Sequence, residues 1–144
     1  MEVTSWRILV IEDNPADVGL LRMALEGAGL KFELIVLDDG AEALAFVRRE
    51  PKYNSFPQPD LIVLDRFLPK NDSLEVLEAI GRSDALKGVP LVTMTSMASN
   101  DLPPHVDREI LKPLTLQEYL NIGPVLKEIL LQHRQGKAWD AIGL

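Results

Sequence analysis

The strongest constraint on the fold is the order in which two kinds of apolar segment follow each other along the chain. Short runs rich in aliphatic and β-branched residues alternate with longer segments whose apolar residues recur at helical spacing. The short runs are residues 7–11, 32–37, 61–64, 91–95 and 108–111. Continuously apolar strands are typical of sheets buried on both faces, and parallel strands need crossover connections. The alternation therefore predicts an α/β fold with a doubly wound, five-stranded parallel sheet.

Recognisable signals mark where the helical segments begin and end. Asn14 is a good N-cap, Pro15 suits a first helical turn, and Gly29 suits the end of that helix. Residues 50–59 carry three prolines and are expected to form a loop. We expect three further helices. One begins near residue 41, one begins near residue 73, and the last spans Thr115 to about Arg134.

The connection between the last two strands leaves little room for a helix. Pro103 and Pro104 lie inside it, and each removes a backbone donor and clashes with a preceding turn. Leu102 precedes a proline and is pushed toward extended geometry. At most one turn is expected, around Ser99 to Leu102, so the fourth helix should be shortened or missing.

Polar side chains follow four of the five predicted strands. Glu12 and Asp13 come after the first strand, Asp65 after the third, Thr95 after the fourth and Lys112 after the fifth. The carboxyl ends of parallel strands share one edge of the sheet, which is where ligands bind in such folds. Clustered carboxylates repel unless a cation lies among them, and oxygen ligands suit Mg²⁺. An aspartate nucleophile beside a lysine and a hydroxyl is a suitable set for a phosphoryl group.

Each of these residues also has an ordinary structural interpretation. Glu12 and Asp13 suit the start of the following helix, while Asp65 and Thr95 are acceptable strand ends. Lys112, with Pro113 behind it, is acceptable as a strand stop. Four such coincidences at successive strand ends are improbable together, so the functional interpretation is favoured.

The chain resembles the receiver domain of response regulators. The resemblance covers nearly its whole length and is most specific in Pro59-Asp60-Leu61-Ile62-Val63-Leu64-Asp65-Arg66-Phe67-Leu68-Pro69. It implies a flavodoxin-like fold in which Asp65 accepts a phosphoryl group. It also implies Mg²⁺ bound directly by Asp13 and Asp65, with Glu12 acting through a water and the backbone carbonyl of Phe67 as a further ligand.

The same resemblance assigns the remaining residues of the site. Thr95 would be the switch hydroxyl, Lys112 the permanent cation, and Lys112–Pro113 a cis peptide. The implied function is that of a stand-alone response regulator in a two-component phosphorelay, phosphorylated by a sensor histidine kinase. It would catalyse only its own phosphorylation and dephosphorylation. The loop 49–59 and Leu68-Pro69-Lys70 resemble the small regulators paired with phytochrome-type histidine kinases.

Three departures from the family pattern concern how the signal leaves the domain. Ser73 stands where glycine is usual, and Glu109 stands where an aromatic switch residue is usual. The interval from Thr95 to Lys112 is several residues shorter than is common. We therefore expect a receiver domain over residues 1–135 and a tail over 136–144. The hypothesis is that phosphorylation is read through the final helix and Trp139 of this tail, in a homodimer.

Composition narrows the function classes. The net charge of −7, from 22 acidic and 15 basic residues, disfavours binding to nucleic acid. The chain has no cysteine and no apolar run near the ~20 residues that span a bilayer, so a cytoplasmic location is expected. Two alternatives remain open: a pseudo-receiver that binds partners without phosphorylation, and an enzyme on the same architecture. A pseudo-receiver usually lacks one of the site residues that this chain retains.

Overall fold

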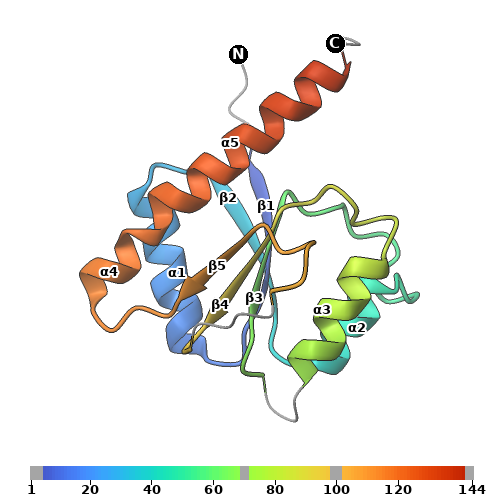
Figure 1. The fold of residues 1–144 in the computed structure, drawn as a ribbon, viewed down its shortest axis with the longest axis horizontal. Coiled ribbons are helices and arrows are strands. Elements are labelled where there is room, and N and C mark those ends of the chain that lie inside the picture. The colour runs from blue at the N-terminus through green and yellow to red at the C-terminus, as the bar shows by residue number, and fades with distance from the viewer. Residues whose placement is uncertain (1–4, 69–71, 98–101, 142–144) are drawn as a thin grey trace.

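The sheet has five parallel strands in the order β2-β1-β3-β4-β5 (Figure 1). The computed structural model describes residues 5–68, 72–97 and 102–141. The strands are β1 (Trp6–Ile11), β2 (Phe32–Leu37), β3 (Leu61–Asp65), β4 (Leu91–Thr95) and β5 (Arg108–Leu111). The doubly wound parallel sheet predicted from the sequence is confirmed.

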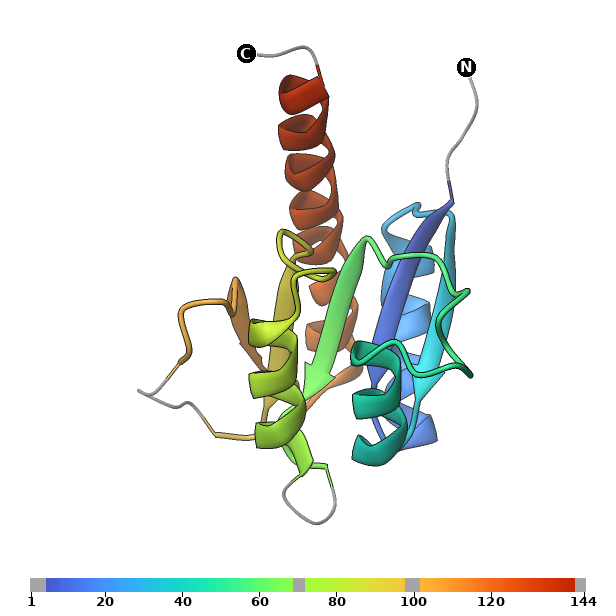
Figure 2. The same ribbon diagram turned by 90° about the vertical axis from the view of Figure 1, so that its right-hand side faces the viewer.

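Helices cover both faces of this sheet (Figures 1 and 2). They are α1 (Pro15–Gly27), α2 (Gly40–Val47), α3 (Asp72–Arg82), α4 (Leu116–Leu120) and α5 (Ile122–Ala141). Successive side chains of a strand point to opposite faces, so β1 divides its residues between two apolar layers. Ile8 and Val10 pack with α1, α4 and α5, whereas Leu9 and Ile11 pack with α2 and α3. Every residue of β3 and β4 is buried, which agrees with their central place in the sheet.

Side-chain caps fix where three helices begin. Asn14, Asp39 and Thr115 precede α1, α2 and α4, and the side-chain oxygen of each accepts a backbone N–H of the first turn, at 2.9, 2.8 and 3.1 Å. After α1, Gly29 adopts a φ of +79°, a conformation that favours glycine. The predicted start and end of the first helix are therefore close to those observed.

The final helix differs from the prediction at both ends. The expected single helix from Thr115 is divided into α4 and α5 at Asn121. Pro124 explains the division, because it has no N–H to continue the hydrogen bonds of α4 but suits the first turn of a new helix. The predicted end at Arg134 was also wrong, since α5 continues to Ala141. Residues 136–141 of the expected tail are thus helical, and α5 extends beyond the sheet (Figures 1 and 2).

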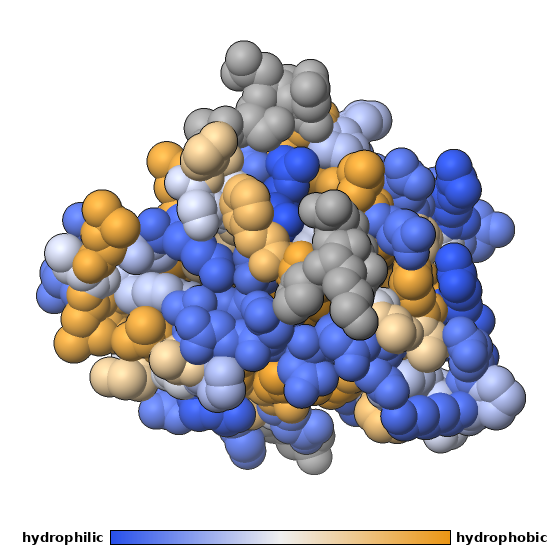
Figure 3. Space-filling view, turned by 90° about the horizontal axis from the view of Figure 1, so that it is seen from below, coloured by the Kyte–Doolittle hydropathy of each residue, from blue (hydrophilic) through white to orange (hydrophobic). Residues whose placement is uncertain are grey.

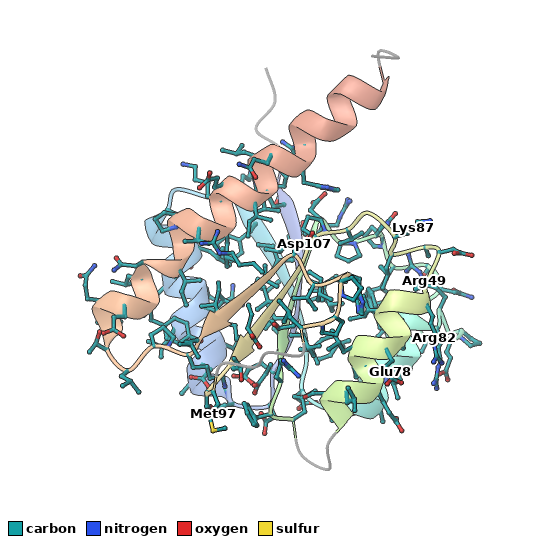
Figure 4. The ribbon with its side chains drawn as sticks, viewed as in Figure 1. Arg49, Glu78, Arg82, Lys87, Met97 and Asp107 are labelled. Atoms are coloured by element: carbon teal, nitrogen blue, oxygen red, sulfur yellow. The ribbon has the colours of Figure 1, made fainter. Side chains whose placement is uncertain are left out.

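The connection between β4 and β5 contains no helix among its described residues, 96–97 and 102–107. Most of the turn expected at Ser99 to Leu102 lies outside the described residues. The connection starts at Met97 beside the carboxyl edge of the sheet and returns to Asp107 at the opposite end (Figure 4). There the Asp107 carboxylate accepts the N–H of Leu91 at 2.7 Å, and a ring nitrogen of His105 is hydrogen-bonded to the carbonyl of Leu77 in α3 at 2.8 Å.

No helix within the described ranges is both long enough and apolar enough to cross a membrane.

Candidate functional site

The polar residues predicted at the strand ends meet at one edge of the sheet. Asp65 is the last residue of β3 and Thr95 the last of β4, while Glu12 and Lys112 directly follow β1 and β5. The pairing register aligns these ends, and the N–H of Lys112 donates to the carbonyl of Thr95 at 2.7 Å. Figure 3 views the molecule from this side, where hydrophilic side chains fill much of the centre.

Three carboxylates form a compact acidic cluster. Glu12, Asp13 and Asp65 each offer an oxygen, and these oxygens lie within 4.8 Å of one another. Glu12 and Asp65 are buried, whereas Asp13 is exposed. Among the described residues, the buried Oε2 of Glu12 has no hydrogen-bond partner. A hard divalent cation such as Mg²⁺ suits this donor set, because its ligands are oxygens and its charge relieves the repulsion between them.

Lys112 extends its ammonium group into the same cluster. Its Nζ lies 3.1 Å from Oε1 of Glu12, 3.2 Å from Oδ2 of Asp17 and 3.2 Å from Oδ2 of Asp65. A strongly hydrated ammonium loses water when it is partly buried, and three carboxylate contacts compensate for that loss. Lys112 therefore neutralises part of the negative charge at this edge.

The pKa values of the two buried acids move apart. Burial, followed by the hydrogen bond that a protonated Glu12 makes with Asp65, raises the pKa of Glu12 to about 9. Burial would also raise the pKa of Asp65, but the hydrogen bond from Glu12, the N–H of Phe67 and the charge of Lys112 together lower it. Burial would lower the pKa of Lys112, yet its contacts with Glu12, Asp65 and Asp17 raise it. Asp65 is consequently the carboxylate that stays ionised, as a nucleophile requires.

Asp17 also belongs to the site, although it is not among the site residues expected from the sequence. It lies in the first turn of α1, which directly follows the end of β1, and its Oδ2 is 3.2 Å from Nζ of Lys112. Its backbone carbonyl accepts the hydroxyl of Tyr119 from α4 at 3.3 Å. Burial and then the charge of Asp17 raise the pKa of Tyr119. The one sequence signal for Asp17 is its place in the first helical turn after β1, and acids are common at that place in surface helices.

The turn after Asp65 is held by side-chain hydrogen bonds. The N–H of Phe67 donates to Oδ1 of Asp65 at 3.0 Å. The buried hydroxyl of Ser73 donates to the carbonyl of Asp65 at 2.8 Å and accepts the N–H of Leu68 at 3.0 Å. Phe67, whose carbonyl was predicted as a metal ligand, therefore lies in a braced turn beside the acidic cluster.

Thr95 and Glu109 are engaged outside the acidic cluster. The hydroxyl of Thr95 donates to the carbonyl of Met97 at 2.9 Å, and within the described residues it forms no hydrogen bond with Asp65. Glu109 forms an ion pair with Arg66, the residue after Asp65, at 3.0 Å. Because β4 lies between β3 and β5, this pair crosses over β4, in which Thr93 is in register with Glu109.

One predicted feature of the site is wrong. The described residues contain no cis peptide bond, so Lys112–Pro113 is trans. A trans bond is favoured by roughly 0.5–1 kcal/mol even before proline. The Lys112 side chain reaches the cluster with the trans bond in place.

Comparison with known proteins identifies the fold and the family. Residues 8–121 match the response regulator receiver domain family. Response regulator Rcp1 of Synechocystis sp. (strain PCC 6803) is 40% identical over 94 residues, which cover 65% of this chain and 64% of that protein. The match thus spans slightly less than two thirds of Rcp1. The probable methanogenesis regulatory protein FilR2 of Methanothrix harundinacea is 35% identical over 130 residues, covering 86% of this chain and 83% of FilR2.

Solved structures agree with these matches. The phosphorylated cyanobacterial phytochrome response regulator RcpA has a TM-score of 0.78 and 34% identity, covering 89% of this chain and 95% of that one. The Mn²⁺-bound form of Rcp1 has a TM-score of 0.74 and 33% identity, and the match covers 85% of this chain and 91% of that one. The parallel sheet, the strand-end residues and these matches lead to one conclusion: this chain belongs to the response regulator receiver domain family of two-component signalling proteins.

Proposed function

We propose that this protein is a phosphorylation switch in which Asp65 accepts a phosphoryl group from a sensor histidine kinase. The observation that carries the proposal is the environment of Asp65. This buried carboxylate has its pKa lowered, lies within the three-acid cluster and has the Lys112 ammonium 3.2 Å away. An oxygen of Asp65 would attack phosphorus, the bond from phosphorus to the histidine nitrogen would break, and that nitrogen would keep the electron pair.

The surrounding residues supply the charge that this transfer needs. Glu12, Asp13, Asp65 and the Phe67 carbonyl would hold Mg²⁺, which neutralises charge on the transferred group. Lys112 would stabilise a phosphoryl oxygen as a fixed cation. Thr95 would exchange its hydrogen bond to Met97 for one to the phosphoryl group, which makes it the switch hydroxyl.

We infer that the kinase partner is of the phytochrome type. RcpA, whose fold this chain shares, is described as a phytochrome response regulator, and this chain is similar to Rcp1 as well. The loop 49–59 and Leu68-Pro69-Lys70, which resemble that group of regulators, support the same partner.

Incubation with acetyl phosphate and Mg²⁺, followed by intact-mass spectrometry, tests the proposal. The wild type should gain one phosphoryl group, and Asp65→Asn, which keeps the size of the side chain but removes the nucleophile, should gain none. Asp38→Asn is the matched control, because Asp38 is an exposed acid that follows β2 at the same edge. It should be labelled like the wild type. Equal labelling of Asp65→Asn would refute the assignment, and an unlabelled wild type would favour a pseudo-receiver.

A further inference from the structure

We propose that Asp17 is a positioning residue that takes over Lys112 when Mg²⁺ binds to the acidic cluster. The inference deepens the proposed function and rests on it, since it concerns how the same site changes between its metal-free and metal-bound forms.

Three of the oxygens that a cation could use are already engaged. Oδ2 of Asp65 contacts the Lys112 ammonium, and Oδ1 of Asp65 accepts the N–H of Phe67. Oε1 of Glu12 contacts Lys112 as well. The lysine therefore occupies part of the place that a divalent cation needs. Two cations at the same oxygens repel each other, so Lys112 must give up Glu12 and Asp65 when Mg²⁺ binds.

Asp17 is the third carboxylate on Lys112 and the one outside the acidic cluster. The cluster comprises Glu12, Asp13 and Asp65, whereas Asp17 approaches the ammonium from α1. Its side chain and that of Lys112 are each 21% exposed, so neither is fully screened by water. Once Lys112 has lost its contacts with Glu12 and Asp65, its partly buried ammonium still needs a negative partner, and Asp17 is the carboxylate that remains.

The backbone of Asp17 is anchored independently of Lys112. The first turn of α1 is capped by Asn14, and the Tyr119 hydroxyl donates to the Asp17 carbonyl at 3.3 Å. Tyr119 itself is buried, at 4% exposure. Asp17 is therefore a fixed point toward which a flexible lysine side chain can withdraw without leaving the edge of the sheet.

A thermodynamic cycle with Lys112 tests this role, with Mg²⁺ affinity measured by isothermal titration calorimetry. Asp17→Asn should weaken Mg²⁺ binding roughly tenfold, because it removes the partner that draws Lys112 away from the cluster. In a Lys112→Met background there is no ammonium to withdraw, and the same substitution should change the affinity less than about twofold. Asp17→Glu keeps the carboxylate and should retain most of the wild-type affinity.

The controls separate this role from a general charge effect and from the proposed function. Asp38→Asn removes a charge at the same edge, and Asp38 makes no described contact with Lys112, so it should leave the affinity almost unchanged in both backgrounds. An equal loss from Asp17→Asn in both backgrounds would overturn the inference, as would no loss in the wild type. Phosphoryl labelling of the wild type is a separate experiment. If Asp65 is not a phosphoryl acceptor, the labelling experiment fails, whereas the Mg²⁺ affinities of the Asp17 and Lys112 variants still test the role of Asp17.

Discussion

Ser73 shows how a single side chain organises the turn beside Asp65. The hydroxyl serves two backbone groups at once, the carbonyl of Asp65 and the N–H of Leu68, and Ser73 is only 6% exposed. Glycine, which is usual at this position in the family, has no side chain to make these bonds. The serine therefore braces the turn of this chain with a side chain that glycine would lack.

Removal of this hydroxyl should destabilise the protein. Ser73→Ala leaves two buried backbone groups without a partner, and the free energy of unfolding should fall by about 1–3 kcal/mol in urea denaturation. Ser83→Ala is the matched control, because the Ser83 hydroxyl accepts one part-buried N–H, that of Leu86. Ser83→Ala should lower the free energy of unfolding by less than half as much as Ser73→Ala. Equal losses for the two variants would show that the Ser73 hydroxyl does not brace the turn.

At the scale of elements, α1 and α5 approach each other at a glycine. A Cβ built on Gly123 would lie 2.1 Å from the carbonyl oxygen of Ala24 and 3.2 Å from Cβ of Ala28. The first turn of α5 therefore rests directly on the backbone of α1. Asp17 of α1 and Tyr119 of α4 belong to the same helical layer.

A pair of glycine substitutions checks this contact. Gly123→Ala must push the two helices apart and should cost about 1–3 kcal/mol of unfolding free energy. Gly19→Ala makes the same chemical change in α1, where the added Cβ meets nothing within 4 Å. It should stabilise the protein by up to about 1 kcal/mol, because alanine favours helix. If Gly123→Ala and Gly19→Ala change the stability equally in thermal unfolding, the close packing of α1 and α5 is contradicted.

At the scale of the whole molecule, the acidic cluster links folding to Mg²⁺ and to pH. A ligand that binds only the folded state stabilises it, by on the order of 1–3 kcal/mol at ten- to hundredfold excess over Kd. Millimolar Mg²⁺ should therefore raise the melting temperature. Asp13→Ala should abolish most of the rise, and Asp13 is exposed, so the variant should still fold.

The increase in melting temperature that Mg²⁺ causes should also become larger as pH rises. The pKa of Glu12 is raised from 4.5 to about 9, so between these two pH values the folded cluster without Mg²⁺ holds a proton that the unfolded chain has released. In the metal-free protein the stability from this proton is full below pH ~4.5 and is lost as pH rises toward 9. Mg²⁺ competes with the proton, so its stabilising effect should be larger at pH 8 than at pH 6. A smaller effect at pH 8 would contradict this account of Glu12.

The sequence by itself determined the parallel sheet and most of the site. Buried strands and capped helices leave local signals, so the strand positions and the cap at Asn14 were predicted correctly. Because parallel strands place their carboxyl ends at one edge, the meeting of Glu12, Asp65 and Lys112 followed from the order of elements alone. These features depend on periodicity and topology, which a sequence carries directly.

Only the tertiary structure decided which side chains contact each other at that edge. Asp17 appeared to be an ordinary acid in a first helical turn, and its contact with Lys112 depends on how α1 lies against the sheet. The Arg66–Glu109 pair joins strands that are not neighbours, so no local pattern indicates it. The trans bond before Pro113 and the continuation of α5 past Arg134 each depend on small free-energy differences that the local sequence signals did not resolve. Such contacts depend on distances between elements, and residue order does not contain those distances.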